Sequence, residues 1–149
     1  MASIATAPVS TDTVRFLDCR ARVLTSGDAT DERFGLVEMS SIPAGSMPPL
    51  HVHHAHDEGF FVLEGSVTLF IRGASVELGV GDYYVAPCRI PHTYRVGATD
   101  ARWLTTSSPA GFERFVAGVA ALATQDPESV TAVAAANDIE ILGPPGTMP

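Results

Sequence analysis

The sequence predicts an all-β domain that is followed by two α-helices. Short apolar runs, separated by glycine and proline at the spacing of a sandwich or barrel, fill residues 14–106. After Pro109 the apolar residues recur at helical spacing. The length of 149 residues suits one domain with a sizeable core. The predicted organisation is an N-terminal arm over residues 1–13, a β-domain over 14–108, and helices with a tail over 109–149.

Nine strands are expected in the β-domain. Each is a run rich in apolar, β-branched or aromatic residues that ends at a turn signal. The expected strands are residues 15–24, 35–40, 51–56, 58–63, 66–71, 75–78, 83–86, 93–96 and 102–106. In the segment 66–71, side chains suited to a strand fill both alternating faces, so this strand is expected to be covered on both sides.

The first helix is predicted from one apolar face. Its members fall at i, i+3, i+4, i+7 and i+10, and they are Phe112, Phe115, Val116, Val119 and Leu122. The expected N-cap is Ser108, with Pro109 next and Glu113 in the first turns.

The second helix has a clearer start. Asp126 is the expected N-cap, Pro127 takes the first helical position, and Glu128 lies near the positive end of the helix dipole. This helix is expected to run to Ala136 and to stop at Asn137. The tail GPPGTMP is expected to form no regular element.

Composition excludes several classes of function. The net charge of −8 argues against nucleic-acid binding, because phosphate backbones would repel the chain. All nine basic residues are arginine, so Schiff-base chemistry, covalent pyridoxal phosphate and a P-loop are excluded. No apolar run approaches the ~20 residues that cross a bilayer, and the start lacks a signal-peptide pattern, so a cytoplasmic protein is expected. Cys19 and Cys88 form no disulfide framework and are expected to be reduced packing residues.

A cluster of histidines and acidic residues lies in the middle of the chain, in the segment HVHHAHDEGFFVLEG. Imidazoles with a carboxylate are ligands for a borderline divalent metal. On a strand, His51 and His53 point to one face, close enough for two nitrogens to converge on one ion. Glu58 has the opposite parity, so it joins them only if the chain bulges or turns between His54 and Asp57.

A rival register uses His54, His56 and Glu58, whose parity agrees without a bulge. Alternation alone does not choose between the two registers. In either case a fourth ligand is expected from a distant strand, and His92 is the remaining histidine of the sequence.

These residues resemble two motifs of the cupin superfamily, in particular its small single-domain members. The first motif, Gly-x5-His-x-His-x(3,4)-Glu-x6-Gly, is met in full by Gly45, His51, His53, Glu58 and Gly65. The second, Gly-x5-Pro-x-Gly-x2-His-x3-Asn, is met by Gly81, Pro87 and His92. It departs at Arg89, where glycine is usual, and at Val96, where asparagine is usual.

The resemblance implies a cupin jelly-roll barrel over residues 14–108 and one divalent transition metal ion per chain. The implied ligands are His51, His53, Glu58 and His92. Iron, nickel, manganese, cobalt, copper and zinc all accept this set. The neighbouring histidines at positions 54 and 56 are expected to face outward, as is more usual in this motif.

The substrate is expected in an apolar pocket beside the metal. Tyr94 shares parity with His92, and Phe60 and Val62 share parity with Glu58, so these three side chains are the expected substrate contacts. Gly65 is expected to close a hairpin with a positive φ angle.

The chain resembles the quercetinase-type small cupins, which cleave enolic substrates with molecular oxygen. A metal-dependent dioxygenase is therefore the first functional hypothesis, with Glu58 as the general base that takes the enol proton. A redox-neutral cyclase or isomerase of polyketide-type substrates, and a non-enzymatic ligand-binding cupin, are the alternatives. The expected partners are a small-molecule substrate and a second copy of the chain in a homodimer. A composition rich in alanine, arginine and glycine suits a GC-rich bacterial genome.

Overall fold

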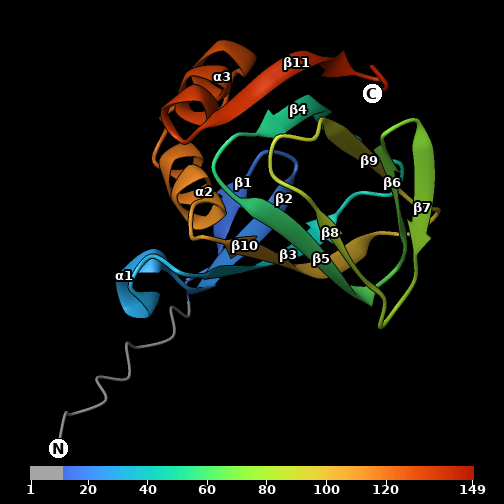
Figure 1. Ribbon diagram of the computed structural model, residues 1–149, viewed down its shortest axis with the longest axis horizontal. Coiled ribbons are helices and arrows are strands. Elements are labelled where there is room, and N and C mark those ends of the chain that lie inside the picture. The colour runs from blue at the N-terminus through green and yellow to red at the C-terminus, as the bar shows by residue number, and fades with distance from the viewer. Residues whose placement is uncertain (1–11) are drawn as a thin grey trace, which may run out of the picture.

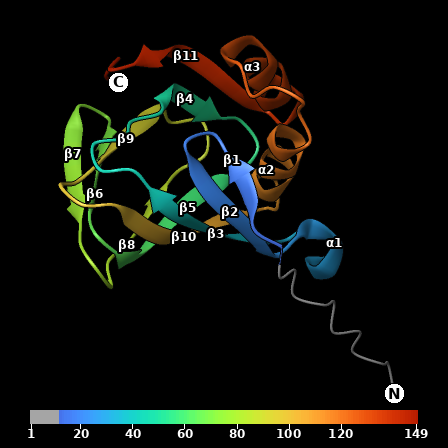
Figure 2. The same cartoon turned by 180° about the vertical axis from the view of Figure 1, so that it is seen from behind.

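Two antiparallel sheets that face each other form the body of the molecule in the computed structural model, which describes residues 12–149. Together they enclose the interior as a barrel, and two helices lie along one side (Figure 1; Figure 2). The expected all-β jelly-roll barrel with two C-terminal helices is confirmed. The expected arm over residues 1–13 lies almost wholly outside the described residues.

The first sheet has the strand order β1-β2-β3-β10-β5-β8. Its strands are β1 (Val14–Phe16), β2 (Cys19–Thr25), β3 (Gly35–Ile42), β10 (Ala101–Ser108), β5 (Asp57–Glu64) and β8 (Tyr83–Ala86). The second sheet has the order β11-β4-β9-β6-β7. Its strands are β11 (Ile139–Pro145), β4 (Pro49–His53), β9 (His92–Val96), β6 (Val67–Ile71) and β7 (Ala74–Leu78).

Each expected strand segment contains a strand in the structure, and there are three differences in detail. Residues 15–24 form a hairpin of β1 and β2, because Leu17 takes a left-handed φ of 55° and reverses the chain. A short helix, α1 (Gly27–Thr30), follows β2 and was not expected. Residues 54–56 leave the strand that was predicted for them, because the chain crosses there from the second sheet to the first.

The first C-terminal helix, α2 (Phe112–Ala120), begins later than predicted. Its N-cap is Gly111, and the assignment of Ser108 as the cap is wrong. Ser108 instead ends β10, where it pairs with Asp57 of β5, so the chain is still extended at that residue. The second helix, α3 (Pro127–Ala136), has the predicted cap, since the Asp126 side chain accepts a hydrogen bond from the Ser129 backbone N–H at 2.9 Å.

The structure of the C-terminal tail differs from the prediction that it forms no regular element. Gly143, Pro144 and Pro145 were expected to be irregular, yet they end β11, which pairs with β4. Proline is tolerated because β11 is an edge strand and its ladder shifts register on both sides of Gly143. Among the described residues, no helix is long and apolar enough to cross a membrane.

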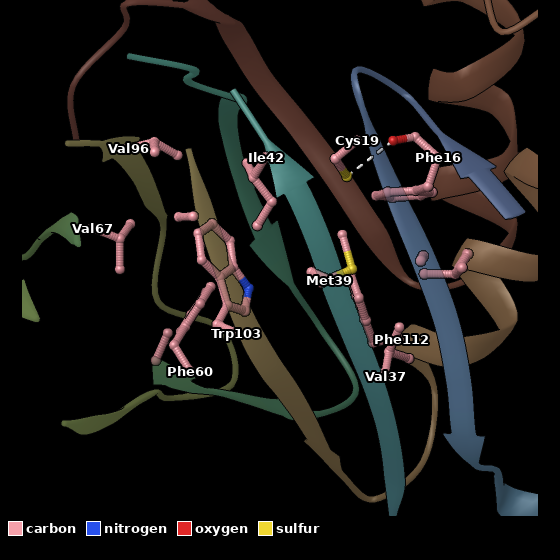
Figure 3. Packing of buried hydrophobic residues seen from close by; sticks show 14 of the residues in the cluster. Phe16, Cys19, Val37, Met39, Ile42, Phe60, Val67, Val96, Trp103 and Phe112 are labelled. Carbon is pink, nitrogen blue, oxygen red and sulfur yellow. Dashed lines mark hydrogen bonds between the residues drawn. The ribbon is translucent and has the colours of Figure 1, made fainter. Parts of the chain in front are cut away.

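The core fills the space between the two sheets. Figure 3 shows Trp103 and Phe60 side by side, and their ring centroids are 6.0 Å apart. The Cys19 thiol is buried and donates a hydrogen bond to the Phe16 carbonyl at 3.1 Å (Figure 3). In β6 one face is buried, whereas Thr68 and Phe70 on the other face are half-buried, so the expected two-sided cover is incomplete.

Candidate metal centre

Three histidines and one glutamate come together between the sheets. His51 and His53 lie on β4, and His92 begins β9 as the direct cross-strand partner of His51. Glu58 lies on β5, which belongs to the opposite sheet. The second sheet therefore supplies three imidazoles and the first sheet supplies the carboxylate.

The four side chains are close enough to share one ion. The Glu58 Oε2 atom lies 3.0 Å from the Nε2 atoms of His53 and His92, and 4.0 Å from that of His51. One ligating atom from each residue falls within 4.8 Å of the others. Glu58, His53 and His92 are almost fully buried, and the His51 side chain is 12% exposed. His51 therefore marks the side of the cluster that is nearest to solvent.

The structure distinguishes the two registers that alternation left open. His54 points away from the cluster and pairs with Glu140 on β11, with 2.7 Å between Nε2 and Oε2. The loop at residues 54–56 supplies the turn that lets Glu58 face His51 and His53.

The expectation that His56 faces outward is wrong. Its side chain is only 1% exposed, and its Nε2 atom lies 2.7 Å from Nδ1 of His53. The physical reason is the crossing of the chain between the sheets, which folds residues 54–56 back against the start of α2, where Gly111 contacts the His56 ring. Strand parity carries no information about a residue in such a loop.

Backbone carbonyls fix the tautomers of two histidines. Nδ1 of His51 lies 2.9 Å from the Pro49 carbonyl oxygen, and Nδ1 of His92 lies 3.1 Å from that of Ile90. Because a carbonyl oxygen can only accept, each Nδ1 carries a proton and donates it. Each Nε2 is thereby directed at the cluster, which is the orientation that a metal-ligating histidine needs.

An unpaired atom shows that the residues fit a metal ion. Nε2 of His53 is buried and has no hydrogen-bond partner among the described residues, although Glu58 Oε2 lies 3.0 Å away in a direction unsuited to a hydrogen bond. Buried polar atoms are rarely left without a partner, and an ion would supply one. Imidazole and carboxylate together suit a borderline divalent metal. The buried cluster therefore suggests a metal site.

Electrostatics inside the cluster favour an ionised glutamate. Burial alone would raise the pKa of Glu58, but the neighbouring histidines, His53 above all, hold that pKa well below its usual value. Burial lowers the pKa of His53 against the opposing effect of Glu58. At His92 burial is outweighed by the hydrogen bond to Glu58, and its pKa is raised. Metal binding here would have to displace the proton that His92 shares with Glu58.

Two turn residues support the cluster. Gly65 has the predicted positive φ, at 74°, where β5 turns into β6. Arg89 occupies the position where the second motif usually has glycine, and its φ is 67°, so an arginine holds the left-handed turn. The Arg89 backbone N–H donates to the His53 carbonyl at 2.7 Å and fastens this turn to β4.

Of the three expected substrate contacts, Phe60 is the one whose ring packs near a histidine of the cluster. The Phe60 ring centroid is 6.5 Å from that of His92, and Tyr94 packs edge-on against Phe60 at 6.0 Å and against Trp103 at 5.1 Å. Val62 is fully buried. Burial raises the pKa of the Tyr94 phenol well above its usual value, so the phenol stays protonated. Tyr94 is half-buried, and the Phe60 ring packs edge-on against both Tyr94 and His92.

Two hollows of about 300 and 280 Å³ lie away from the cluster. The first is lined by Arg15, Leu17, Asp18, Cys19, Arg20 and Ser41. The second is lined by His54, Thr131, Ala135, Asp138, Ile139, Glu140 and Ile141. Neither hollow is lined by a residue of the cluster.

Comparison with known proteins agrees with the fold. The family model described as "Cupin domain" matches residues 38–107. Quercetin 2,3-dioxygenase of Bacillus subtilis is 31% identical over 94 residues, which span 63% of this chain but only 28% of that enzyme.

Two solved structures share the architecture. KdgF from a Halomonas species superposes with a TM-score of 0.60 at 19% identity, covering 68% of this chain and 91% of that one. The polyketide cyclase RemF from Streptomyces resistomycificus superposes with a TM-score of 0.52 at 26% identity, covering 70% of each chain.

Proposed function

We propose that the chain, which matches the cupin domain model over residues 38–107, is a metal-dependent dioxygenase that acts on an enolic or aromatic small molecule, as a quercetinase does. The observation that carries the proposal is the buried group of three histidines and Glu58, in which Nε2 of His53 has no hydrogen-bond partner among residues 12–149. The dioxygenase relative supports the oxygen chemistry, although this chain matches only about a quarter of its length.

In this proposal His51, His53 and His92 hold one divalent transition metal ion and Glu58 is the fourth ligand. A bound ion of this kind supplies Lewis acidity and, where it is redox-active, a path for electrons to oxygen. The protein's part is to present neutral imidazoles from a rigid sheet and to keep water away from the centre.

Glu58 has a second role as general base. Its carboxylate is ionised, and Oε2 lies inside the cluster, 3.0 Å from Nε2 of His92, where it could accept a proton from a bound substrate. The enol hydroxyl of a substrate would give its proton to this oxygen, leaving an enolate and a neutral carboxylic acid. Phe60, Val62 and Tyr94 would form the apolar wall that contacts the substrate ring. The substrate would approach from the side of His51, the most exposed member of the cluster.

The test begins with metal content. We expect about one equivalent of metal in the purified wild-type protein, and almost none in a His53→Ala, His92→Ala double variant. The His54→Ala variant is the matched control, because His54 is exposed and points away from the cluster. An absence of metal from the wild type, even after reconstitution with each candidate ion, would contradict the proposal.

Oxygen consumption then tests the reaction class. With enolic aromatic substrates we expect uptake of one oxygen molecule per substrate consumed, and no turnover under nitrogen. Equal turnover in air and under nitrogen would exclude the dioxygenase.

A redox-neutral cyclase is the second candidate, and its support is the resemblance to the polyketide cyclase RemF at 26% identity. The same ion would then polarise a carbonyl, and Glu58 would move a proton. A zinc-loaded protein that stays active under nitrogen would identify this function. Metal binding without turnover of any substrate would instead identify a ligand-binding cupin.

Assembly and location follow as further proposals. We expect a homodimer, because β7 and β8 are edge strands and Val80, Tyr83 and Val85 beside them are exposed. A bacterial and cytoplasmic origin stays a prediction from composition.

A further inference from the structure

His56 is a buried histidine that the proposed metal chemistry does not use. Its Nε2 atom lies 2.7 Å from Nδ1 of His53, and the two ring centroids are 4.6 Å apart at 72°. Its side chain is 1% exposed. The contact therefore joins a proposed metal ligand to a second imidazole in a dry environment.

The partner of His53 differs in kind from those of the other two histidines. His51 and His92 each donate from Nδ1 to a backbone carbonyl, which can only accept, so their tautomers have no alternative. An imidazole nitrogen can either accept or donate. The tautomer of His53 is therefore set by the tautomer of His56.

One arrangement is compatible with metal binding. If Nε2 of His53 offers its lone pair to an ion, the His53 proton is on Nδ1 and is donated to Nε2 of His56. His56 must then carry its own proton on Nδ1. The reverse arrangement would place the His53 proton on Nε2, where it would block the ligand position.

The start of α2 holds the His56 ring in place. A Cβ added at Gly111 would lie 2.7 Å from Nδ1 of His56, so the ring packs directly on the glycine backbone. The Gly111 N–H donates to Oε2 of Glu113 at 2.9 Å, and the Ser107 hydroxyl donates to the same oxygen at 3.1 Å. These two hydrogen bonds connect helix α2 to β10, and they fix the backbone at Gly111 on which the His56 ring packs.

We propose that His56 is a positioning residue: it accepts the hydrogen bond from Nδ1 of His53 and so holds Nε2 of His53 in the metal-binding tautomer. This inference rests on the proposed metal site and adds a residue that the motif does not contain. Outer partners of this kind typically change metal affinity by about ten- to hundredfold.

The test compares three folded variants by cobalt binding, using the visible absorption of bound Co²⁺. His56→Leu removes the acceptor at similar volume, and we expect its Kd for Co²⁺ to rise about ten- to hundredfold. His56→Gln keeps an acceptor oxygen near the position of Nε2 and is expected to stay within about threefold of the wild type. His54→Leu is the control, because His54 is exposed and faces Glu140, and no change is expected.

Nitrogen-15 imidazole spectra of the zinc-loaded wild type provide the second readout. We expect a hydrogen-bonded proton on Nδ1 of His53 and an unprotonated Nε2 on His56. If His56→Leu does not fold, this spectrum and the His56→Gln variant decide the question.

The outcomes separate this inference from the proposed function. Unchanged cobalt affinity in folded His56→Leu, an equal loss in His56→Gln, or a proton on Nε2 of His56 directed at His53 overturns the role of His56. A wild type that binds neither Co²⁺ nor Zn²⁺ overturns the metal site instead. In that case the metal-free spectrum still tests the direction of the hydrogen bond.

Discussion

Gly65 and Arg89 share a left-handed backbone conformation, with φ angles of 74° and 67°, but their surroundings differ. A Cβ added at Gly65 would lie 2.7 Å from the Asp100 carbonyl oxygen, which belongs to the backbone and cannot easily move. Arg89 is exposed, so its side chain has room. A substitution at the first position therefore meets both strain and a clash, whereas the second position carries strain alone.

We expect Gly65→Val to lower the free energy of unfolding by more than about 1 kcal/mol, measured by urea denaturation. Gly73→Val is the matched control, because Gly73 also has a positive φ, of 71°, but no atom of the described part of the chain lies within 4 Å of an added Cβ. The loss at Gly65 should exceed the loss at Gly73. Equal losses would show that crowding against Asp100 contributes nothing.

At Arg89 we expect a substitution to raise the free energy of unfolding rather than to lower it. Arg89→Gly should raise the free energy of unfolding by about 0.5–1 kcal/mol, because glycine adopts the left-handed conformation without the Cβ penalty. The hydrogen bond from the residue 89 N–H to the His53 carbonyl is retained, so metal affinity should not change. The same urea experiment measures the change, and a loss of stability would mean that the arginine side chain makes a stabilising contact.

At the scale of elements, β4 depends on β11 for most of its pairing. β4 carries His51 and His53, yet its ladder to β9 consists of the single pair His51 with His92. On its other edge β11 pairs along the whole strand, with Ile139 opposite His53 and Ile141 opposite His51. The strand that holds two proposed ligands is thus fixed by the C-terminal segment.

Truncation tests this dependence. A protein that ends at Asp138 should have a lower unfolding midpoint and a cobalt Kd at least about tenfold higher, because β4 loses its main ladder. A protein that ends at Thr147 keeps all of β11 and is the control. Wild-type affinity in the shorter protein would show that the pair with β9 is enough to hold β4.

Two features that the sequence analysis missed, β11 and the burial of His56, show what local patterns cannot supply. Alternation and turn residues located the strands, and motif spacing brought His51, His53, Glu58 and His92 together correctly. β11 was missed because its Gly-Pro-Pro end has no strand propensity and forms only against β4. The burial of His56 was missed because it depends on Gly111, which is 55 positions away along the chain. Both features are set by non-local contacts.

For the whole molecule, the buried histidines predict that the stability of the metal-free protein is greatest near pH 6.5. Burial lowers the pKa of His53, and that of His56 to about 4. Below pH 6.5 these two histidines therefore bind protons in the unfolded chain but not in the folded protein. The free energy of unfolding falls as the pH drops towards 4. The raised pKa of His92 acts on the other side, since its stabilisation is lost as the pH rises through that value.

Urea unfolding of EDTA-treated protein between pH 4.5 and 8.5 measures this profile. Each proton that the unfolded chain binds and the folded protein does not bind changes the free energy of unfolding by up to about 1.4 kcal/mol per pH unit. His56→Gln should reduce the slope on the acid side, whereas His54→Gln should leave it unchanged because His54 is exposed. A stability that is flat between pH 4.5 and 6.5 would contradict the prediction.

The division of the cluster between the sheets has a mechanical consequence. Three of its members belong to one sheet and Glu58 alone belongs to the other. An ion held by all four would act as a cross-link that staples the two halves of the barrel together, and it would stabilise the folded protein by RT ln(1 + [M]/Kd). In Glu58→Gln the ion would be bound mainly by the three histidines of one sheet, and its cross-link to the other sheet would be weakened. Separation of the two sheets, rather than dissociation of the histidines from the ion, would then become the first step of unfolding.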